Sequence, residues 1–204
     1  MSDWLSLEAL AVVFSLAYLV LAMRENSLCW FCAFFGTAIY IWVFGGVSLY
    51  MGSLLHVYYL VMAVYGWYQW RRGGVEHRGV RISRWGLTQH LYALLAVVLA
   101  SAVSGHLLSQ HTDAHLPYLD SFTTWGGVLT TVMVARKILE NWLYWIVVDG
   151  ASIYLYLDRE LYLTAGLFAV YLVLVVLGFI RWRKHYLEQP ITERRQEFAA
   201  PDVI

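Results

Sequence analysis

Seven apolar stretches, each close to the length of a membrane-crossing helix, divide the chain. They cover approximately residues 4–23, 28–45, 49–70, 86–107, 119–135, 141–157 and 161–182. About 20 apolar residues cross the hydrocarbon core of a bilayer, where the backbone must satisfy its own hydrogen bonds. The stretches lack the alternating pattern of barrel strands. The sequence, 60% hydrophobic and 14% charged, therefore predicts an all-α integral membrane protein with seven transmembrane helices.

An internal repeat relates the two ends of the chain. Residues 20–72 align without a gap to residues 132–184, at an offset of 112 positions. The identical pairs include Trp30/Trp142, Leu49/Leu161, Tyr59/Tyr171, Gly66/Gly178 and Trp70/Trp182. Each copy holds three apolar stretches, so the additional one at 86–107 lets both copies run in the same direction. We therefore predict two parallel three-helix bundles joined by a connector helix.

The basic residues are strongly segregated between the two sides of the predicted membrane protein. The predicted parts are a first bundle (1–72), a basic loop with the connector helix and an outer loop (73–112), a second bundle (113–184) and a polar tail (185–204). With seven spans, all Lys and Arg residues except Arg159 fall on the side that holds the loop and the tail. The positive-inside rule then predicts an outside amino terminus and a cytosolic carboxyl terminus.

The sixth stretch carries the polar groups that are hardest to place in lipid. Trp142, Trp145 and Asp149 are spaced to share one helical face, and Asn141 lies beside them. A carboxylate near the middle of a span requires water or a polar partner. Indole rings with carboxylate and amide groups suit a flat polar ring that carries hydroxyls. The alternative is structural: an interhelical hydrogen bond for the carboxylate, with the tryptophans as packing or interfacial anchors.

The repeat shows where the two copies differ. Trp30, Ala33 and Thr37 stand at the positions equivalent to Trp142, Trp145 and Asp149, so the same face is retained with lower polarity. Such divergence is what an asymmetric ligand between two similar halves requires. We therefore add Thr37 to the predicted substrate site. The third stretch contributes Tyr59, Trp67 and Gln69 as further candidates, although packing or solvation explains Tyr59 and Gln69 equally well.

Other chemistries find little support in the sequence. The Cys29-x-x-Cys32 pair lies in an apolar helix without a second pair of metal ligands, and His111-x-Asp113-x-His115 is read as an exposed polar loop. A seven-helix retinal protein needs a lysine buried within a span to form its Schiff base. The two lysines, Lys137 and Lys184, both lie at membrane edges. We expect no cofactor, no metal, no nucleic-acid partner and no enzymatic activity.

The runs ENWLYWIVVD (140–149), LYLTAGLFAVYLVLVVLGFIRWRK (161–184) and YGWYQWRR (65–72) resemble the PnuC family of bacterial nicotinamide riboside transporters. The resemblance covers nearly the whole chain and implies the same seven-span fold, similar to that of the SWEET sugar transporters. It implies uptake of nicotinamide riboside across the bacterial inner membrane by facilitated diffusion, with a cytosolic nicotinamide riboside kinase trapping the product. The resemblance implies that the family's aromatic and polar signature maps onto Asn141, Trp142, Trp145 and Asp149, with Tyr65, Trp67 and Gln69 as contributors from the third span.

Two alternatives remain open. The cargo could be a related vitamin or nucleoside, since the sequence does not show the shape of the pocket. A seven-helix membrane receptor is an alternative of a different class. We expect the protein to lie in a lipid bilayer, and the sequence is compatible with a homo-oligomer. All three prolines (Pro117, Pro190 and Pro201) lie outside the predicted spans, so we expect any conformational change to bend at glycines or to rock rigid bundles.

Overall fold

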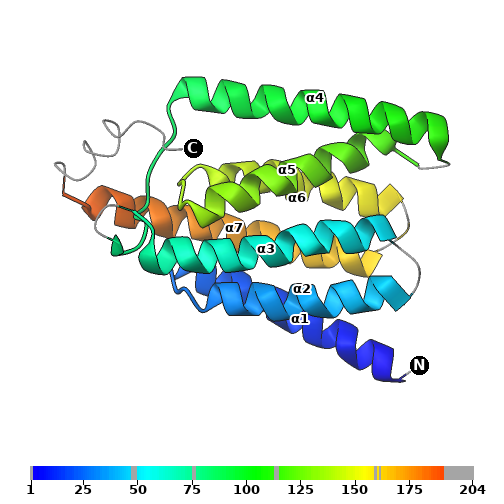
Figure 1. Ribbon diagram of the computed structural model, residues 1–204, viewed down its shortest axis with the longest axis horizontal. Helices are drawn as coiled ribbons and strands as arrows, with labels where there is room; N and C mark the ends of the chain where they lie inside the picture. The colour runs from blue at the N-terminus through cyan, green and yellow to red at the C-terminus, as the bar shows by residue number, and fades with distance from the viewer. Residues whose placement is uncertain are drawn as a thin grey trace.

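The computed structural model describes residues 2–46, 50–74, 77–112, 115–158, 160 and 162–190, and its regular structure is helical (Figure 1). The helices are α1 (Ser2–Met23), α2 (Cys29–Gly46), α3 (Tyr50–Arg72), α4 (Leu87–His111), α5 (Pro117–Ala135), α6 (Asn141–Asp158) and α7 (Tyr162–Glu188). The predicted all-α fold of seven helices is confirmed. The pair Leu49/Leu161, Asp113 of the histidine motif and the tail beyond residue 190 lie outside the described residues.

The helices follow the apolar stretches with small differences at their ends. Helix α7 continues to Glu188, four residues into the segment predicted as a tail. Pro117 is the first residue of α5, a position that needs no backbone N–H. Within the described residues, α4 and residues 165–188 of α7 are each long and apolar enough to cross a membrane on their own.

The structure repeats the sequence offset of 112 residues at the helix ends. Helices α1 and α5 end at equivalent residues, α2 and α6 share both bounds, and α3 and α7 begin at equivalent residues. Even the turns agree, because Glu25 and its equivalent Lys137 both adopt positive φ, at 53° and 51°. We call α1–α3 the first repeat and α5–α7 the second repeat.

The two repeats contact each other reciprocally, α1 against α7 and α3 against α5. The indole Nε1 of Trp70 in α3 donates to the carbonyl of Val134 in α5, at 3.1 Å. Its equivalent, Trp182 in α7, donates to the carbonyl of Ala22 in α1, also at 3.1 Å. The two rings lie 5.9 Å apart between centroids. Each acceptor is a carbonyl in the last turn of a helix of the other repeat, and each also accepts a backbone N–H from the turn that follows, from Lys137 and Glu25 respectively.

Two further tryptophans extend this contact into both repeats. Trp30 meets Trp70 edge to face at 5.6 Å, and Trp142 meets Trp182 edge to face at 5.3 Å. We call Trp30, Trp70, Trp182 and Trp142 the tryptophan chain. Glycines make room for its outer members, because a Cβ atom at Gly66 would lie 2.3 Å from the Trp30 ring and one at Gly178 would lie 2.6 Å from the Trp142 ring.

An ion pair joins the equivalent turns beside the tryptophan chain. Lys137 Nζ lies 3.1 Å from Glu25 Oε2, with side chains only 11% and 16% exposed. The same ammonium lies 4.7 Å from the centre of the Trp70 ring, within range of a cation–π interaction. His185 in α7 also contacts the Glu25 carboxylate. Residues of opposite charge thus occupy matching positions of the repeat and meet between its halves.

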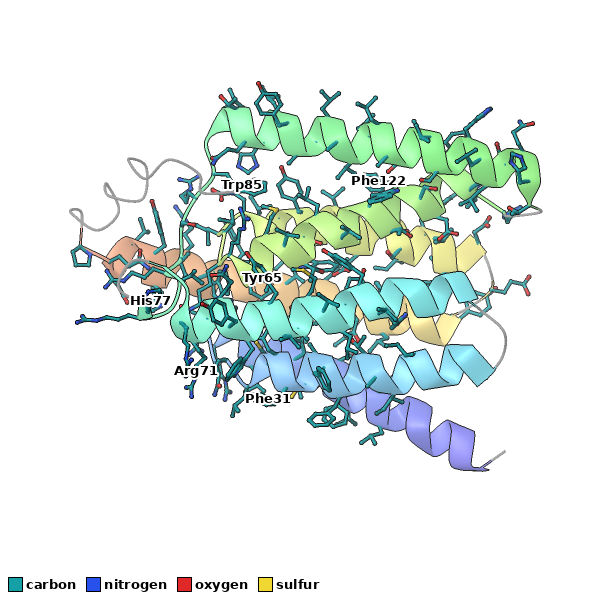
Figure 2. The ribbon with its side chains drawn as sticks, viewed as in Figure 1. Phe31, Tyr65, Arg71, His77, Trp85 and Phe122 are labelled. Atoms are coloured by element: carbon teal, nitrogen blue, oxygen red, sulfur yellow. The ribbon has the colours of Figure 1, made fainter. Side chains whose placement is uncertain are left out.

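Helix α4 belongs to neither repeat and packs against α5. The loop before it is bound to the α5–α6 turn: Ser83 N donates to Lys137 O (3.1 Å), and Leu139 N donates to Ser83 O (2.8 Å). Arg84 Nε donates to Glu140 Oε1 at 2.6 Å, and this hydrogen bond raises the pKa of the guanidinium above its usual value. The loop between α3 and α4, the turns that follow α1 and α5, and the end of α7 lie together, and we call them the basic end of the molecule. Figure 2 shows Arg71 and His77 at this end.

The contact between Gly178 and the Trp142 ring generates the first prediction. We expect Gly178→Ala to destabilise the protein by about 1–3 kcal/mol, because the added methyl group must displace a buried indole ring. Gly166→Ala is the matched control on the same helix, since a Cβ atom there meets no atom within 4 Å. Thermal unfolding in detergent is the measurement. An equal loss of stability in both variants would contradict the packing argument.

The second prediction concerns the pair Glu25–Lys137. We expect Lys137→Glu to destabilise the protein strongly, because two carboxylates would face each other in a largely buried place. Adding Glu25→Lys should recover most of the loss, since the exchanged charges can pair again and both positions share the same backbone conformation. Thermal unfolding of the single and double variants measures the recovery. A double variant as unstable as Lys137→Glu would show that the two charges are not coupled.

Candidate functional site

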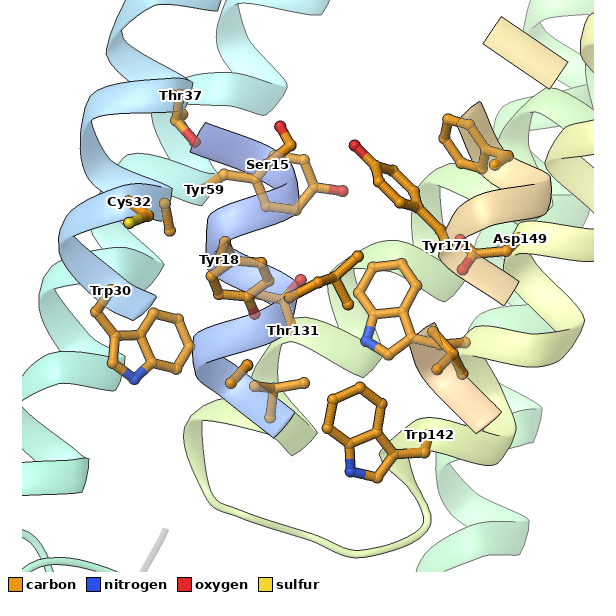
Figure 3. A pocket seen from close by; sticks show the side chains of 18 of the residues that line it. Ser15, Tyr18, Trp30, Cys32, Thr37, Tyr59, Thr131, Trp142, Asp149 and Tyr171 are labelled. Atoms are coloured by element: carbon orange, nitrogen blue, oxygen red, sulfur yellow. The ribbon is translucent and has the colours of Figure 1, made fainter. Parts of the chain in front are cut away.

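A cavity of about 280 Å³ lies between the two repeats (Figure 3). Six helices contribute side chains to it, and α4 contributes none. Most of its lining residues are equivalent in the repeat: Leu19/Thr131, Ala22/Val134, Trp30/Trp142, Ala33/Trp145, Thr37/Asp149, His56/Phe168 and Tyr59/Tyr171. The same positions of both copies therefore face one shared space.

The tryptophan chain closes one end of this cavity. Its outer members Trp30 and Trp142 are 2% and 1% exposed, and both line the cavity. Neither indole Nε1 has an acceptor within the described part of the chain. Because a buried N–H without a partner is costly, these two equivalent donors are available to water or to a bound molecule. Figure 3 shows the two rings on opposite sides of the space.

Asp149 is the acidic group of the site. It lies in the middle of α6, is 3% exposed, and accepts no hydrogen bond from a described residue. Asp149 lines the cavity, to which Tyr59 and Tyr171 also contribute. A buried carboxylate without a protein donor carries a large desolvation cost unless a ligand or water approaches it. The chemistry of Asp149 therefore suits contact with a positively charged or hydroxyl-bearing ligand.

The two walls of the cavity differ in chemistry although their backbones match. The first repeat presents Ala33, Thr37 and His56, where the second presents Trp145, Asp149 and Phe168. The aromatic ring contacts are retained: His56 meets Tyr59 at 6.0 Å, and Phe168 meets Tyr171 at 5.3 Å. One wall is thus small and hydroxylic, and the other combines a large aromatic ring with a carboxylate. This difference between the walls favours one orientation of an asymmetric ligand over the other.

Five of the eight residues predicted for the site line this cavity. They are Trp142, Trp145, Asp149, Thr37 and Tyr59. Asn141 is completely buried one residue before Trp142, and its Nδ2 donates to the carbonyl of Ile138 at 2.6 Å. Its Oδ1 has no donor among the described residues. Asn141 therefore supports the turn below the cavity.

Trp67 and Gln69 lie away from the cavity. Trp67 meets the Phe31 ring at 6.2 Å and lines a lateral apolar groove with Phe34 and Phe35. Gln69 Nε2 donates to the Tyr65 hydroxyl at 2.9 Å, and the Gln69 carbonyl accepts from the loop that follows α3. Both residues organise the first repeat and its loop.

The structure adds lining residues that the sequence analysis did not select. Ser15 and Tyr18 come from α1, and Thr131 comes from α5. His56 of α3 also lines the cavity. The available signal was the helical spacing of Ser15, Tyr18 and Ala22, a face of small or polar side chains in an otherwise apolar stretch. Extending the repeat a single residue toward the amino terminus would also have paired Leu19 with Thr131.

The lining chemistry supports binding and offers no reaction centre. None of the residues that line the cavity is Lys or Arg, so it presents no fixed positive charge. Within the described residues, no group of three or more His, Cys, Asp or Glu side chains could hold a metal ion. Cys29 and Cys32 are both free thiols. His115, from the outer histidine motif, contacts Asp158 at 2.7 Å.

The sequence was compared with protein families and with individual known proteins. The family model described as nicotinamide mononucleotide transporter matches residues 5–184. The nicotinamide riboside transporter PnuC of Escherichia coli is 23% identical over 199 residues, covering 85% of this chain and 81% of its own length. The riboflavin/roseoflavin transporter RibM of Streptomyces davaonensis is 25% identical over 139 residues, covering 66% of this chain and 65% of its own.

A solved structure shares the fold. The crystal structure of the vitamin B3 transporter PnuC superimposes with a TM-score of 0.70 at 23% sequence identity, over 87% of this chain and 80% of that one. At this identity the likeness concerns the arrangement of the helices.

Proposed function

The chain belongs to the nicotinamide mononucleotide transporter family and is a membrane transporter, not an enzyme; from this premise we propose that it carries nicotinamide riboside. One observation carries the choice of substrate: the unpaired, buried carboxylate of Asp149 beside the indole rings of Trp142 and Trp145. The nicotinamide ring of this nucleoside is a flat pyridinium cation, and its ribose bears hydroxyls. Indole faces and a carboxylate attract such a cation, and hydroxyl-bearing side chains on the opposite wall suit the sugar.

The transport cycle uses the two repeats as rigid, parallel three-helix bundles, with α4 as the connector. The equivalent helix ends and the reciprocal indole-to-carbonyl bonds support this arrangement. No described helix has a proline beyond its first position, so rocking of the bundles about their mutual contact is the favoured movement. Opening at the basic end separates Trp70 from Val134 and Trp182 from Ala22.

Uptake runs by facilitated diffusion into the cytosol of a bacterium, where a nicotinamide riboside kinase traps the product. The basic end faces the cytosol in this proposal, with the amino terminus outside, in keeping with the positive-inside rule. Asp149 is the only carboxylate among the described residues that line the cavity, and a single acidic group offers no chain of sites for a coupled proton.

A second candidate cargo comes from the relative RibM, which is named for riboflavin and roseoflavin. A flavin has three fused rings. The cavity of about 280 Å³ lies at the lower limit of ligand pockets, which favours a single ring with a sugar. Trp145, which stands where the first repeat has the smaller Ala33, is one of the side chains that limit this volume.

The test of function is a binding titration of the purified protein with nicotinamide riboside, nicotinamide, nicotinamide mononucleotide, thiamine and riboflavin. We expect the riboside to bind most tightly. Nicotinamide lacks both the charge and the sugar, and the mononucleotide brings a phosphate toward a carboxylate in a cavity without Lys or Arg. Thiamine shares the positive charge and so separates charge from shape. Preferred binding of riboflavin would transfer the assignment to the flavin.

Substitutions in the cavity test the assigned residues. We expect Asp149→Asn to weaken binding of nicotinamide riboside roughly 10- to 100-fold, because a charge-assisted contact is lost. Trp145→Ala should weaken it about tenfold through the loss of an aromatic contact. Asp158→Asn is the matched control, since this carboxylate lies on the same helix and contacts His115 outside the cavity. Normal binding by both cavity variants would place the site elsewhere.

The mode of transport is tested in proteoliposomes. We expect uptake of labelled nicotinamide riboside to equilibrate without a proton or sodium gradient. With the kinase and ATP inside the vesicles, uptake should continue beyond equilibrium, because the phosphorylated product cannot use the cavity. Uptake that depends on an imposed proton gradient would refute facilitated diffusion.

A further inference from the structure

A second hollow opens at the basic end, between the last turn of α1 and the last three turns of α7. Its volume is about 770 Å³. None of its lining residues lines the central cavity, so the hollow is a separate feature of the molecule. It lies on the outer side of the contact between α1 and α7, where a membrane protein meets lipid.

The lining changes from apolar to basic along α7. Leu177 and Ile180 are 49% and 58% exposed and belong to the apolar part of the helix. Arg181 and Lys184 follow within the next turn, and both are exposed. The spacing of Leu177, Arg181 and Lys184 puts them on one face of the helix. The hollow therefore presents alkyl groups on the side of the helical bundle and cations toward its end.

The charges of the hollow do not neutralise one another. The Glu25 carboxylate is engaged by Lys137, at 3.1 Å, and by His185. Arg24, Arg181 and Lys184 form no ion pair or hydrogen bond with the described residues, and Glu188 is the remaining acidic group of the lining. Three unpaired cations face one unpaired anion, so the hollow attracts a negatively charged group.

We propose that this hollow binds an anionic phospholipid. Its phosphate would lie among Arg24, Arg181 and Lys184, and the first part of an acyl chain would run along Leu177 and Ile180. A phospholipid is the ligand that combines an anionic group with an adjoining alkyl chain in this order, and basic pockets at the ends of membrane helices suit such headgroups. The proposal is independent of the transported substrate.

The position of the hollow gives the lipid a structural consequence. Glu25 lines the hollow and also pairs with Lys137 between the repeats. A phosphate held by Arg24, the residue directly after α1, and by Arg181 and Lys184 of α7 links the same two helices that Trp182 joins through the Ala22 carbonyl. Bound lipid therefore stabilises the closed basic end.

The test uses the full chain purified in a neutral detergent. Thermal unfolding is followed with added phosphatidylglycerol, with phosphatidylcholine of the same acyl chains, and with inorganic phosphate. We expect only phosphatidylglycerol to raise the midpoint temperature. Arg181→Gln and Lys184→Gln should each weaken this effect about fivefold in lipid concentration, and the double variant roughly 25-fold. An equal rise with inorganic phosphate would identify a site for free anions and overturn the lipid assignment.

Arg183→Gln is the matched control, because this substitution removes the same charge. Arg183 is exposed on the same turn as Arg181 but does not line the hollow. We expect it to keep the full response to phosphatidylglycerol. A loss as large as that in Arg181→Gln would show a general surface effect and refute the site. The molar mass of each variant in solution tests the other occupant: dissociation of an oligomer in Arg181→Gln would make the hollow a contact between copies of the chain.

Discussion

The structure depends on two hydrogen bonds that cross between its halves, from Trp70 to the Val134 carbonyl and from Trp182 to the Ala22 carbonyl. In lipid the hydrophobic effect does little to hold helices together, so packing and such polar contacts determine which helices meet. Each bond ties the end of a third helix to the end of a first helix in the opposite repeat. Together they bring the turns that contain Glu25 and Lys137 within reach of each other, and they hold Trp30 and Trp142 at the closed end of the cavity.

A symmetric frame thus carries an asymmetric site. The tryptophans, the glycines that admit them and the inner tyrosines are the same in both repeats, and these residues shape the space. The residues that differ, Thr37 against Asp149 and Ala33 against Trp145, supply its chemistry. In the proposed transport cycle, the second repeat supplies most of the contacts to the ligand, and the first supplies the matching shape against which it moves.

The sequence predicted the helices and the polar face of α6 well, because both follow from strong local patterns. Hydropathy located the helices, and the spacing of Trp142, Trp145 and Asp149 placed them on one face. The sequence was a poorer guide to which residues of α3 line the cavity. In a membrane helix the outward face is apolar as well, so the pattern does not fix the rotation of the helix about its axis. Trp67 and Trp70 are one turn apart, yet Trp67 faces a lateral groove, whereas Trp70 lies between the repeats. The same ambiguity hid Tyr18, because the face that it shares with Ser15 and Ala22 is only weakly polar.

The gapless offset of 112 residues constrains which insertions, deletions and substitutions this chain can tolerate during evolution. A helix turns by about 100° per residue, so one inserted residue rotates every following side chain of that helix by nearly a third of a turn. In α2 or α6 such an insertion would carry Thr37 or Asp149 off the cavity while leaving composition and hydropathy unchanged. Substitutions are tolerated wherever the phase is kept, as the low identity between the two repeats illustrates. Inherited variation should therefore accumulate as replacements within the helices, and changes of length should be confined to the connections between them and to the ends of the chain.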